Sequence, residues 1–230
     1  MNMNPTDGYN PEIPQTLRDN LAREKEQALT LYIDFVIDGT ASMHSVFPAV
    51  YFAIVHILQA LNGYEINPMI GLTVLRNEQA GEMTELVEFE EGRKFTSDME
   101  AFLKKIRFLK LYGGGDDGKE SVHTAIRRSL DKFEGRGRGK VIMVFTDAYE
   151  SNDTADYMDV PVGQVIFFST DELAEEDFRF CFLREDGELD EEASPMFLSL
   201  ESLLKPMSTE YLDNIVKPVK DLMKGVSIGA

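Results

Sequence analysis

The chain has 230 residues, of which 43% are hydrophobic, and it carries a formal net charge of −18 at pH 7. This apolar content is enough to build the core of a domain of this length, so it argues against global disorder. The acidic balance argues against nucleic acid and anionic membranes as partners, because both are bound through an excess of lysine and arginine.

The first thirty residues are predicted to form an extension that precedes the domain. Residues 1–14 are polar and rich in proline, and residues 16–28 have the pattern of a charged helix. The start of the chain lacks the basic residues and the apolar stretch of a secretory signal. No apolar run approaches the roughly 18 residues needed to span a bilayer. We therefore expect a cytoplasmic protein.

From residue 31 onward, apolar runs alternate with amphipathic segments. Continuous apolar runs predict buried strands, and apolar side chains spaced three and four residues apart predict helices. The expected strands, in chain order, are residues 31–38, 66–75, 86–89, 141–146, 165–168, 179–183 and 196–200. The expected helices are residues 47–61, 99–109, 122–133 and 212–222. We expect Thr96 or Ser97 to cap the second helix, and Pro218 to kink or split the last one.

This order of elements predicts an α/β fold, with a doubly wound, mostly parallel central sheet and helices on both faces. The sequence contains no internal repeat and no linker, so residues 31–230 are expected to form a single domain that includes the C-terminal helix. Its acidic late segment, residues 171–192, has eleven acidic residues against two arginines, which is half of the net charge. A solvated acidic face accounts for this segment, and a surface for a basic partner is the alternative. The single cysteine, Cys181, excludes an intrachain disulfide and a cysteine-based zinc cluster.

Hard oxygen donors follow two of the predicted strands. Asp38 ends the first strand and is followed by Thr40 and Ser42, and Asp147 ends another apolar run. Because the carboxyl ends of parallel strands lie at the same edge of a doubly wound sheet, we expect these side chains to face one crevice. Carboxylates and hydroxyls suit Mg²⁺ or Mn²⁺ better than Zn²⁺, which prefers nitrogen and sulfur.

A glycine loop at residues 113–118 adds a third set of donors. It precedes a helix, which places Asp116 or Asp117 at the same edge of the sheet. Five oxygen ligands on three loops would fit an octahedral Mg²⁺ site completed by water. The candidate metal ligands are Asp38, Thr40, Ser42, Asp116 and Asp147, with Gly113, Gly114 and Gly115 allowing close approach of the backbone.

At these residues the sequence resembles the von Willebrand factor A (VWA) domain family. The metal-ion-dependent adhesion site (MIDAS) of that family has an Asp-x-Ser-x-Ser loop, a threonine after a glycine-rich loop, and an aspartate after the fourth strand. Here the loop from Asp38 to Ser42 matches the first part with Thr40 in place of the first serine. Asp116 stands where the family has its threonine, and Asp147 matches the last part. The resemblance covers roughly residues 31–168.

The resemblance implies a protein-interaction module, not an enzyme, which binds Mg²⁺, Mn²⁺ or Ca²⁺ and recognises a partner protein at the metal-bearing face. Likeness to intracellular members implies an ATPase, kinase or phosphatase of the same multi-protein system as the partner. Asp116 would bring a third carboxylate to a divalent ion and leave the site negatively charged. The extra carboxylate would repel an acidic ligand of the partner, so we expect the site to hold the metal more tightly or to accept a neutral or basic ligand. His44 and Asp117 are candidates for supporting the ligands from outside the coordination sphere.

Two enzyme functions compete with this interpretation. The loop from Gly113 to Glu120 nearly matches the phosphate-binding pattern G-x-x-x-x-G-K-[ST], but it ends in a glutamate that cannot act as the hydroxyl ligand. Residues 35–40 resemble the start of a haloacid-dehalogenase-type phosphatase site with Asp38 as nucleophile, although Thr40 stands where such sites carry a second acid. A phosphate-ester hydrolase using Asp38 is the alternative function. A VWA scaffold that binds its partner without metal is the third.

Overall fold

The computed structural model describes residues 30–114, 119–136, 139–150, 164–169, 195–204 and 208–228, together with Phe178, Phe182 and Glu188. The predicted extension, Cys181 and most of the strand expected at residues 179–183 lie outside this part of the chain. The acidic late segment is also largely outside it, so the extent of the single domain stays a prediction.

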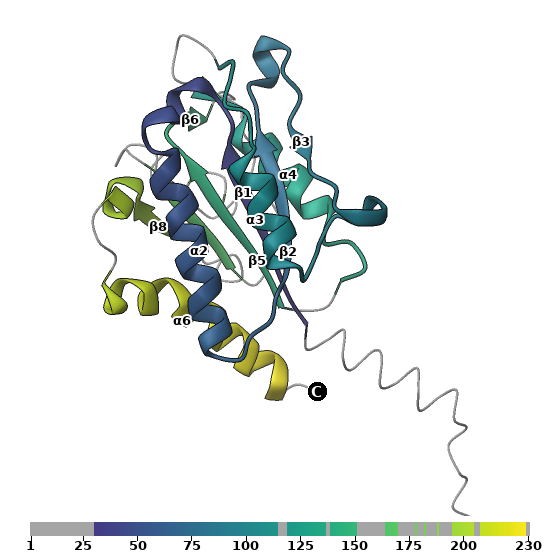
Figure 1. Cartoon of the computed structure of the whole chain (residues 1–230), viewed down its shortest axis with the longest axis vertical. Coiled ribbons are helices and arrows are strands. Elements are labelled where there is room, and N and C mark those ends of the chain that lie inside the picture. Colours follow the sequence, from purple (N-terminus) through teal and green to yellow (C-terminus); the bar gives the residue numbers. More distant parts are fainter. Residues whose placement is uncertain are drawn as a thin grey trace, which may run out of the picture.

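A six-stranded sheet forms the middle layer of the fold (Figure 1). Its strands are β1 (Leu31–Asp38), β2 (Met69–Leu75), β3 (Glu85–Leu86), β5 (Gly139–Thr146), β7 (Gln164–Ser169) and β8 (Met196–Ser199). Their order across the sheet is β3-β2-β1-β5-β7-β8, and all neighbours are parallel except β2 and β3. The chain winds outward in both directions from β1, which places the switch point of the sheet at the carboxyl end of β1. The predicted doubly wound α/β fold is therefore confirmed.

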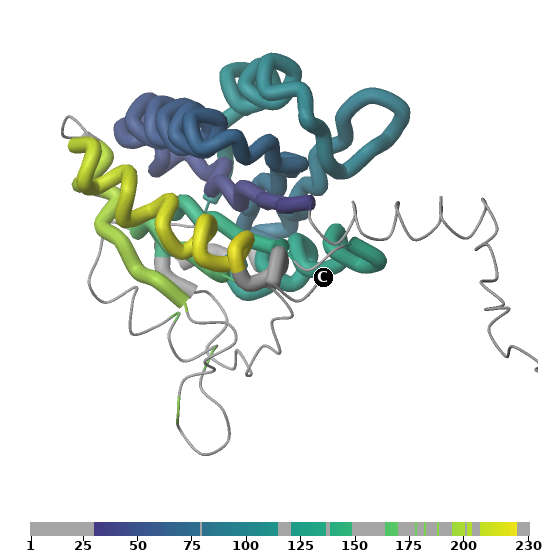
Figure 2. Tube along the Cα trace, turned by 90° about the horizontal axis from the view of Figure 1, so that it is seen from below, coloured from purple at the N-terminus to yellow at the C-terminus, as the bar shows by residue number. Residues whose placement is uncertain are grey.

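Helices cover both faces of this sheet (Figures 1 and 2). The helices α2 (Phe47–Gly63), α3 (Met99–Arg107) and α6 (Thr209–Ile228) share one apolar core with the sheet, and α4 (Val122–Asp131) shares the other. Successive side chains of a strand point to opposite faces. Accordingly, Ile33, Phe35 and Ile37 of β1 enter the first core, and Tyr32 and Val36 enter the second. In the described part of the chain, no helix is both long and apolar enough to cross a membrane.

The sequence patterns predicted which elements form more accurately than they predicted where each element begins and ends. The second strand begins at Met69 and not at residue 66, and β3 is reduced to Glu85–Leu86. The cap of α3 is Asp98, whose side chain accepts a hydrogen bond from the backbone N–H of Ala101 at 2.9 Å. The prediction of Thr96 or Ser97 as the cap is wrong, because Thr96 extends the sheet by pairing its backbone with Ile70.

Pro218 does not split the C-terminal helix. α6 continues through it from Thr209 to Ile228. Its buried side chains, Ile215, Val216 and Val219, lie on both sides of the proline and pack into the core. Tertiary packing of an apolar face stabilises a helix more than local propensity does, so it offsets the missing hydrogen bond.

Candidate functional site

Asp38 lies at the carboxyl end of β1, and its side chain is completely buried. One carboxylate oxygen accepts hydrogen bonds from the backbone N–H of Thr40 at 2.9 Å and from the Thr40 hydroxyl at 2.6 Å. The other accepts a hydrogen bond from the Thr146 hydroxyl at 2.7 Å. Burial raises the pKa of Asp38 to about 6, and these hydrogen bonds oppose the increase only in part.

A chain of oxygen atoms leads from Asp38 to the surface. The hydroxyl oxygens of Thr40 and Ser42 are 3.0 Å apart, and the Ser42 hydroxyl donates to the carboxylate of Asp147 at 2.8 Å. Thr40 is buried, Asp147 is half-buried and Ser42 is exposed. The structure thus brings together four of the predicted metal ligands, from loops that are about a hundred residues apart in the sequence.

The described part of the glycine loop, Gly113 and Gly114, lies against the loop from Asp38 to Ser42. The backbone N–H of Ala41 donates to the carbonyl of Gly113 at 3.2 Å. Gly113 and Gly114 have φ values of 70° and 93°, in the left-handed region that favours glycine. The carboxylate of Glu82 accepts a hydrogen bond from the Gly114 N–H at 3.3 Å and fills the space that a side chain on Gly113 would need. Gly115 and the two aspartates that follow it lie outside the described residues, so the third set of donors stays a prediction.

Sequence reasoning did not identify Arg76, which connects the two loops. Its guanidinium donates to the carbonyl of Gly39 and, at 3.0 Å, to the carbonyl of Lys110. It also bonds Glu85 at 2.9 and 3.1 Å and lies 4.0 Å from the centre of the Tyr112 ring. Arg76 is only 2% exposed. A lone cation directly after the apolar run of β2 was the signal in the sequence, because Arg76 follows Leu75, the residue that lies opposite Asp38 in the sheet.

The side chain of His44 contacts the backbone of the loop from Asp38 to Ser42. The ring is exposed, and its Nδ1 donates to the carbonyl of Ala41 at 2.7 Å. The predicted supporting role is thus directed at the loop's main chain, and whether it affects a bound ion stays a prediction.

The assembled donors have the chemistry of a site for a hard cation. Neighbouring oxygen atoms are separated by 2.6 to 3.0 Å. These are ordinary O–H···O hydrogen-bond distances, which hold together the carboxylate and hydroxyl oxygens that Mg²⁺ prefers as ligands. Within the described ranges, no three histidine, cysteine, aspartate or glutamate side chains gather as a metal site. The described donors are two carboxylates and two hydroxyls, a set that contains no nitrogen or sulfur ligand for Zn²⁺.

These features define a doubly wound α/β domain with a cluster of oxygen donors at the switch point of its sheet. The model of the von Willebrand factor type A domain family matches residues 33–163, more than half of the chain, and the chain belongs to that family. No curated protein matches the sequence.

Two solved structures are similar in fold. Proximal thread matrix protein 1 from the mussel byssus is 12% identical, with a TM-score of 0.54 over 84% of this chain and 48% of that one. The pilus adhesin SpaC from Lactobacillus rhamnosus GG, in its open conformation, is 14% identical, with a TM-score of 0.50 over 86% of this chain and 30% of that one. The chain therefore spans about half the length of the first and less than a third of the second, and at these identities the similarity concerns the fold alone.

Proposed function

We propose that this VWA domain is a protein-interaction module that depends on a divalent cation. The ion is Mg²⁺, with Mn²⁺ or Ca²⁺ as alternatives, and the proposed ligands are Asp38, Thr40, Ser42, Asp116 and Asp147. The observation that carries the proposal is the environment of Asp38. Its carboxylate is fully buried among oxygen donors, and no lysine or arginine of the described residues pairs with it.

A buried carboxylate without a positive partner is unfavourable, because water no longer solvates its charge. A divalent cation at the oxygen chain would supply the missing positive charge. Asp38, Thr40, Ser42 and Asp147 would hold such an ion, which would attract an oxygen atom of a partner protein. Ser42 and Asp147 reach the surface at this point, so a partner has access to the ion there.

The charge of the site and the family to which the chain belongs both bear on the chemistry of the partner. VWA domains are generally protein-interaction modules. If Asp116 is the third carboxylate, the site retains a negative charge and favours a neutral or basic group of the partner. We propose an intracellular multi-protein system as the setting, with an ATPase, kinase or phosphatase as the partner.

Phosphate-ester hydrolysis is less well supported by the geometry. A nucleophilic carboxylate has to reach the phosphorus atom, whereas Asp38 is completely buried. Thr40 and Thr146 also donate to its two oxygens. Both observations favour a ligand role for Asp38.

Calorimetric titration with MgCl₂ and MnCl₂ tests the proposal on EDTA-treated protein. We expect one ion per chain, and we expect Asp38→Ala to weaken binding by about 100-fold or more, since even residues that only support a ligand contribute about 10–100-fold. Asp131→Ala, which removes an exposed carboxylate at the end of α4, serves as the matched control and should bind as the wild type does.

The other outcomes identify the alternatives. A folded wild type that binds neither ion would contradict the metal-dependent model and leave the metal-independent scaffold. Phosphate release from p-nitrophenyl phosphate that is lost in Asp38→Asn would support the hydrolase. Unchanged Mg²⁺ affinity in Asp116→Ala would exclude Asp116 as a ligand.

A further inference from the structure

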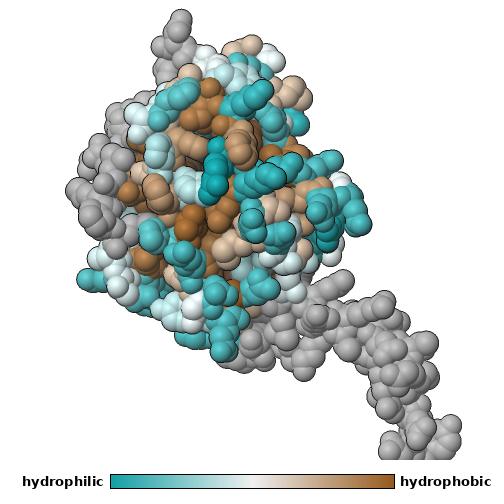
Figure 3. Space-filling model, viewed as in Figure 1, coloured by the Kyte–Doolittle hydropathy of each residue, from teal (hydrophilic) through white to brown (hydrophobic). Residues whose placement is uncertain are grey.

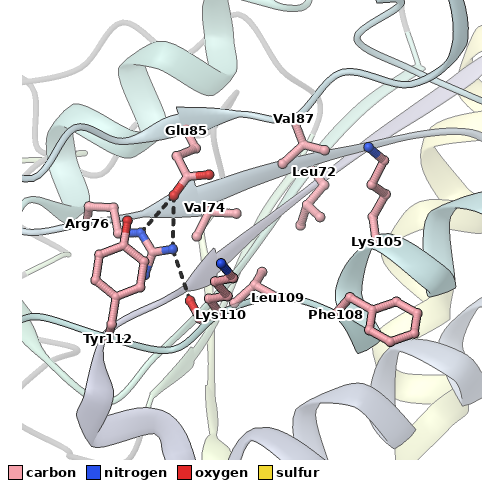
Figure 4. Close-up of a pocket in the computed structure, with 10 residues that line it drawn as sticks. All are labelled: Leu72, Val74, Arg76, Glu85, Val87, Lys105, Phe108, Leu109, Lys110 and Tyr112. Atoms are coloured by element: carbon pink, nitrogen blue, oxygen red, sulfur yellow. Dashed lines mark hydrogen bonds and ion pairs between the residues drawn. The ribbon is translucent and has the colours of Figure 1, made fainter.

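A groove lies beside the proposed metal site, between the edge strand β3 and the end of α3 (Figure 4). It has a volume of about 370 Å³. Its floor is apolar and is formed by Leu72, Val74, Val87 and Leu109. Arg76 and Tyr112 lie at one end, Lys105 and Phe108 lie at the other, and Lys110 lies between them (Figure 4). We call this feature the β3–α3 groove.

The groove is positively charged in a protein that is otherwise strongly acidic. The segment 104–110 contains four cations and no acidic residue. The one carboxylate that lines the groove, Glu85, is already paired with Arg76. Lys105 and Lys110 are exposed, and neither forms an ion pair with any residue that the structure describes. The groove therefore has two cations available for a ligand.

Stabilisation of the helix accounts for only part of this charge. Cations in the last turn of a helix interact favourably with its dipole, which explains a lysine at position 105. Lys110 lies three residues beyond the end of α3 at Arg107, where the effect of the dipole has faded. The position of Lys110 over an apolar floor points to an acidic ligand.

Large aromatic side chains are exposed at both ends of the groove. Phe108 is 70% exposed and Tyr112 is 47% exposed. Figure 3, which views the face with α2 and α3, shows apolar surface between hydrophilic side chains. Exposed apolar surface with a polar rim marks interaction sites, and aromatic residues are enriched at the centres of protein interfaces.

Two residues that line the groove also contact the loop from Asp38 to Ser42. Arg76 contacts the carbonyl of Gly39, and the backbone N–H of Tyr112 donates to the same carbonyl at 3.0 Å. The groove and the loop that carries Asp38, Thr40 and Ser42 therefore share a buried contact at the carbonyl of Gly39.

We propose that the β3–α3 groove is a second docking site, which binds an acidic segment of a partner protein that is rich in leucine and phenylalanine. The carboxylates of the segment pair with Lys105 and Lys110, and its apolar side chains cover the floor. Charge complementarity carries the assignment, because these cations face outward from a protein of net charge −18. The site goes beyond the proposed function, since none of its contacts requires a metal ion.

Fluorescence anisotropy in EDTA tests the proposal independently of the metal. The probe is a fluorescein-labelled twelve-residue peptide in which glutamate and aspartate alternate with leucine and phenylalanine. We expect it to bind, and we expect the double variant Lys105→Glu, Lys110→Glu to weaken binding by about tenfold or more through charge reversal. Lys104→Glu is the matched control, because Lys104 is exposed on the same helix and does not line the groove. It should change the affinity by less than about twofold.

Several results would overturn the proposal. One is failure of the peptide to bind the wild type, and another is equal weakening by Lys104→Glu, which would indicate a diffuse electrostatic effect. Equal binding of a peptide with serine in place of leucine and phenylalanine would exclude the apolar floor. A dimer of the wild type that disappears in the double variant would assign the groove to a second copy of the chain. Failure here leaves the cation titration unaffected, because the two experiments use different ligands and different variants.

Discussion

Two buried aspartates on β1, four residues apart, differ in how their charge is balanced. Asp34 and Asp38 point to the same face of the sheet, and neither has any exposed surface. Asp34 forms an ion pair with the ammonium group of Lys132. It also accepts hydrogen bonds from the hydroxyls of Thr73 at 2.7 Å and Ser129 at 2.5 Å. Asp38 receives only N–H and O–H donors from the described residues.

This difference follows from the position of each residue along the strand. Asp34 lies within the strand, paired with β2 and β5 on either side, and the chain supplies its cation from Lys132. Asp38 lies at the strand end, next to loops that open to the surface at Ser42. The same strand therefore carries one carboxylate that is paired with a cation inside the fold and another for which we propose a role in binding. Both side chains are fully buried, so the difference lies in their neighbours: Asp34 has a cation beside it, and Asp38 has only hydroxyl and N–H groups.

The largest expected effect comes from removing the internal cation. Lys132→Met should lower the free energy of unfolding by about 3–5 kcal/mol, because it leaves the charge of Asp34 buried and unpaired. Urea denaturation measures the loss. Lys104→Met, at an exposed lysine, should stay within about 0.5 kcal/mol of the wild type. A loss of under about 1 kcal/mol in Lys132→Met would show that Asp34 does not depend on this cation.

The second prediction concerns Asp38 and pH. Its folded pKa of about 6 lies above the ordinary value of 3.8, so the ionised carboxylate destabilises the fold. The favourable contribution of the neutral acid is complete below about pH 3.8 and is lost as the pH rises through about 6. In EDTA, Asp38→Asn should therefore be more stable than the wild type by about 1–3 kcal/mol at pH 7.5, and the two should converge near pH 4.

Added metal should reverse the order of stability of the wild type and Asp38→Asn. At pH 7.5, MgCl₂ should raise the melting temperature of the wild type and leave that of Asp38→Asn unchanged, because a ligand stabilises the form that binds it. A wild type that is more stable than Asp38→Asn in EDTA at pH 7.5 would mean that Asp38, like Asp34, already has an internal partner.

The smallest effect is expected at a glycine beside Asp34. A methyl group on Gly71 would lie 2.6 Å from a carboxylate oxygen of Asp34 and 2.9 Å from the ammonium of Lys132. Gly71→Ala should cost about 1–2 kcal/mol by overpacking, measured by urea denaturation. Gly63→Ala has open space around the new methyl group and should be neutral or slightly stabilising. Equal stabilities for the two variants would show that the ion pair can move to accommodate the methyl group.

The pattern of the sequence predicted the elements of the sheet and two of the three loops. The apolar run of β1 and the 3.6-residue period of α2 are local properties, so they are visible without a structure. Asp38 and Asp147 could be placed together because parallel strands share one carboxyl edge. Asp116 rests on the same argument and stays a prediction.

Where α3 begins and how far α6 extends could not be predicted from local sequence signals. Thr96 and Ser97 were the predicted caps of α3, but Asp98 caps it, and the backbone of Thr96 pairs with Ile70 in the sheet. The helix α6 continues through Pro218 because its apolar side chains pack into the core. In both cases a tertiary contact outweighed a local preference.

The sequence by itself therefore determined the fold class, the order of the elements and the oxygen donors at two strand ends. These follow from periodicity and from the topology that all doubly wound sheets share. Only the tertiary structure paired Asp34 with Lys132, bridged two loops with Arg76 and opened the β3–α3 groove. Such contacts join residues far apart in the chain, and they depend on how side chains pack across elements, which no local pattern records.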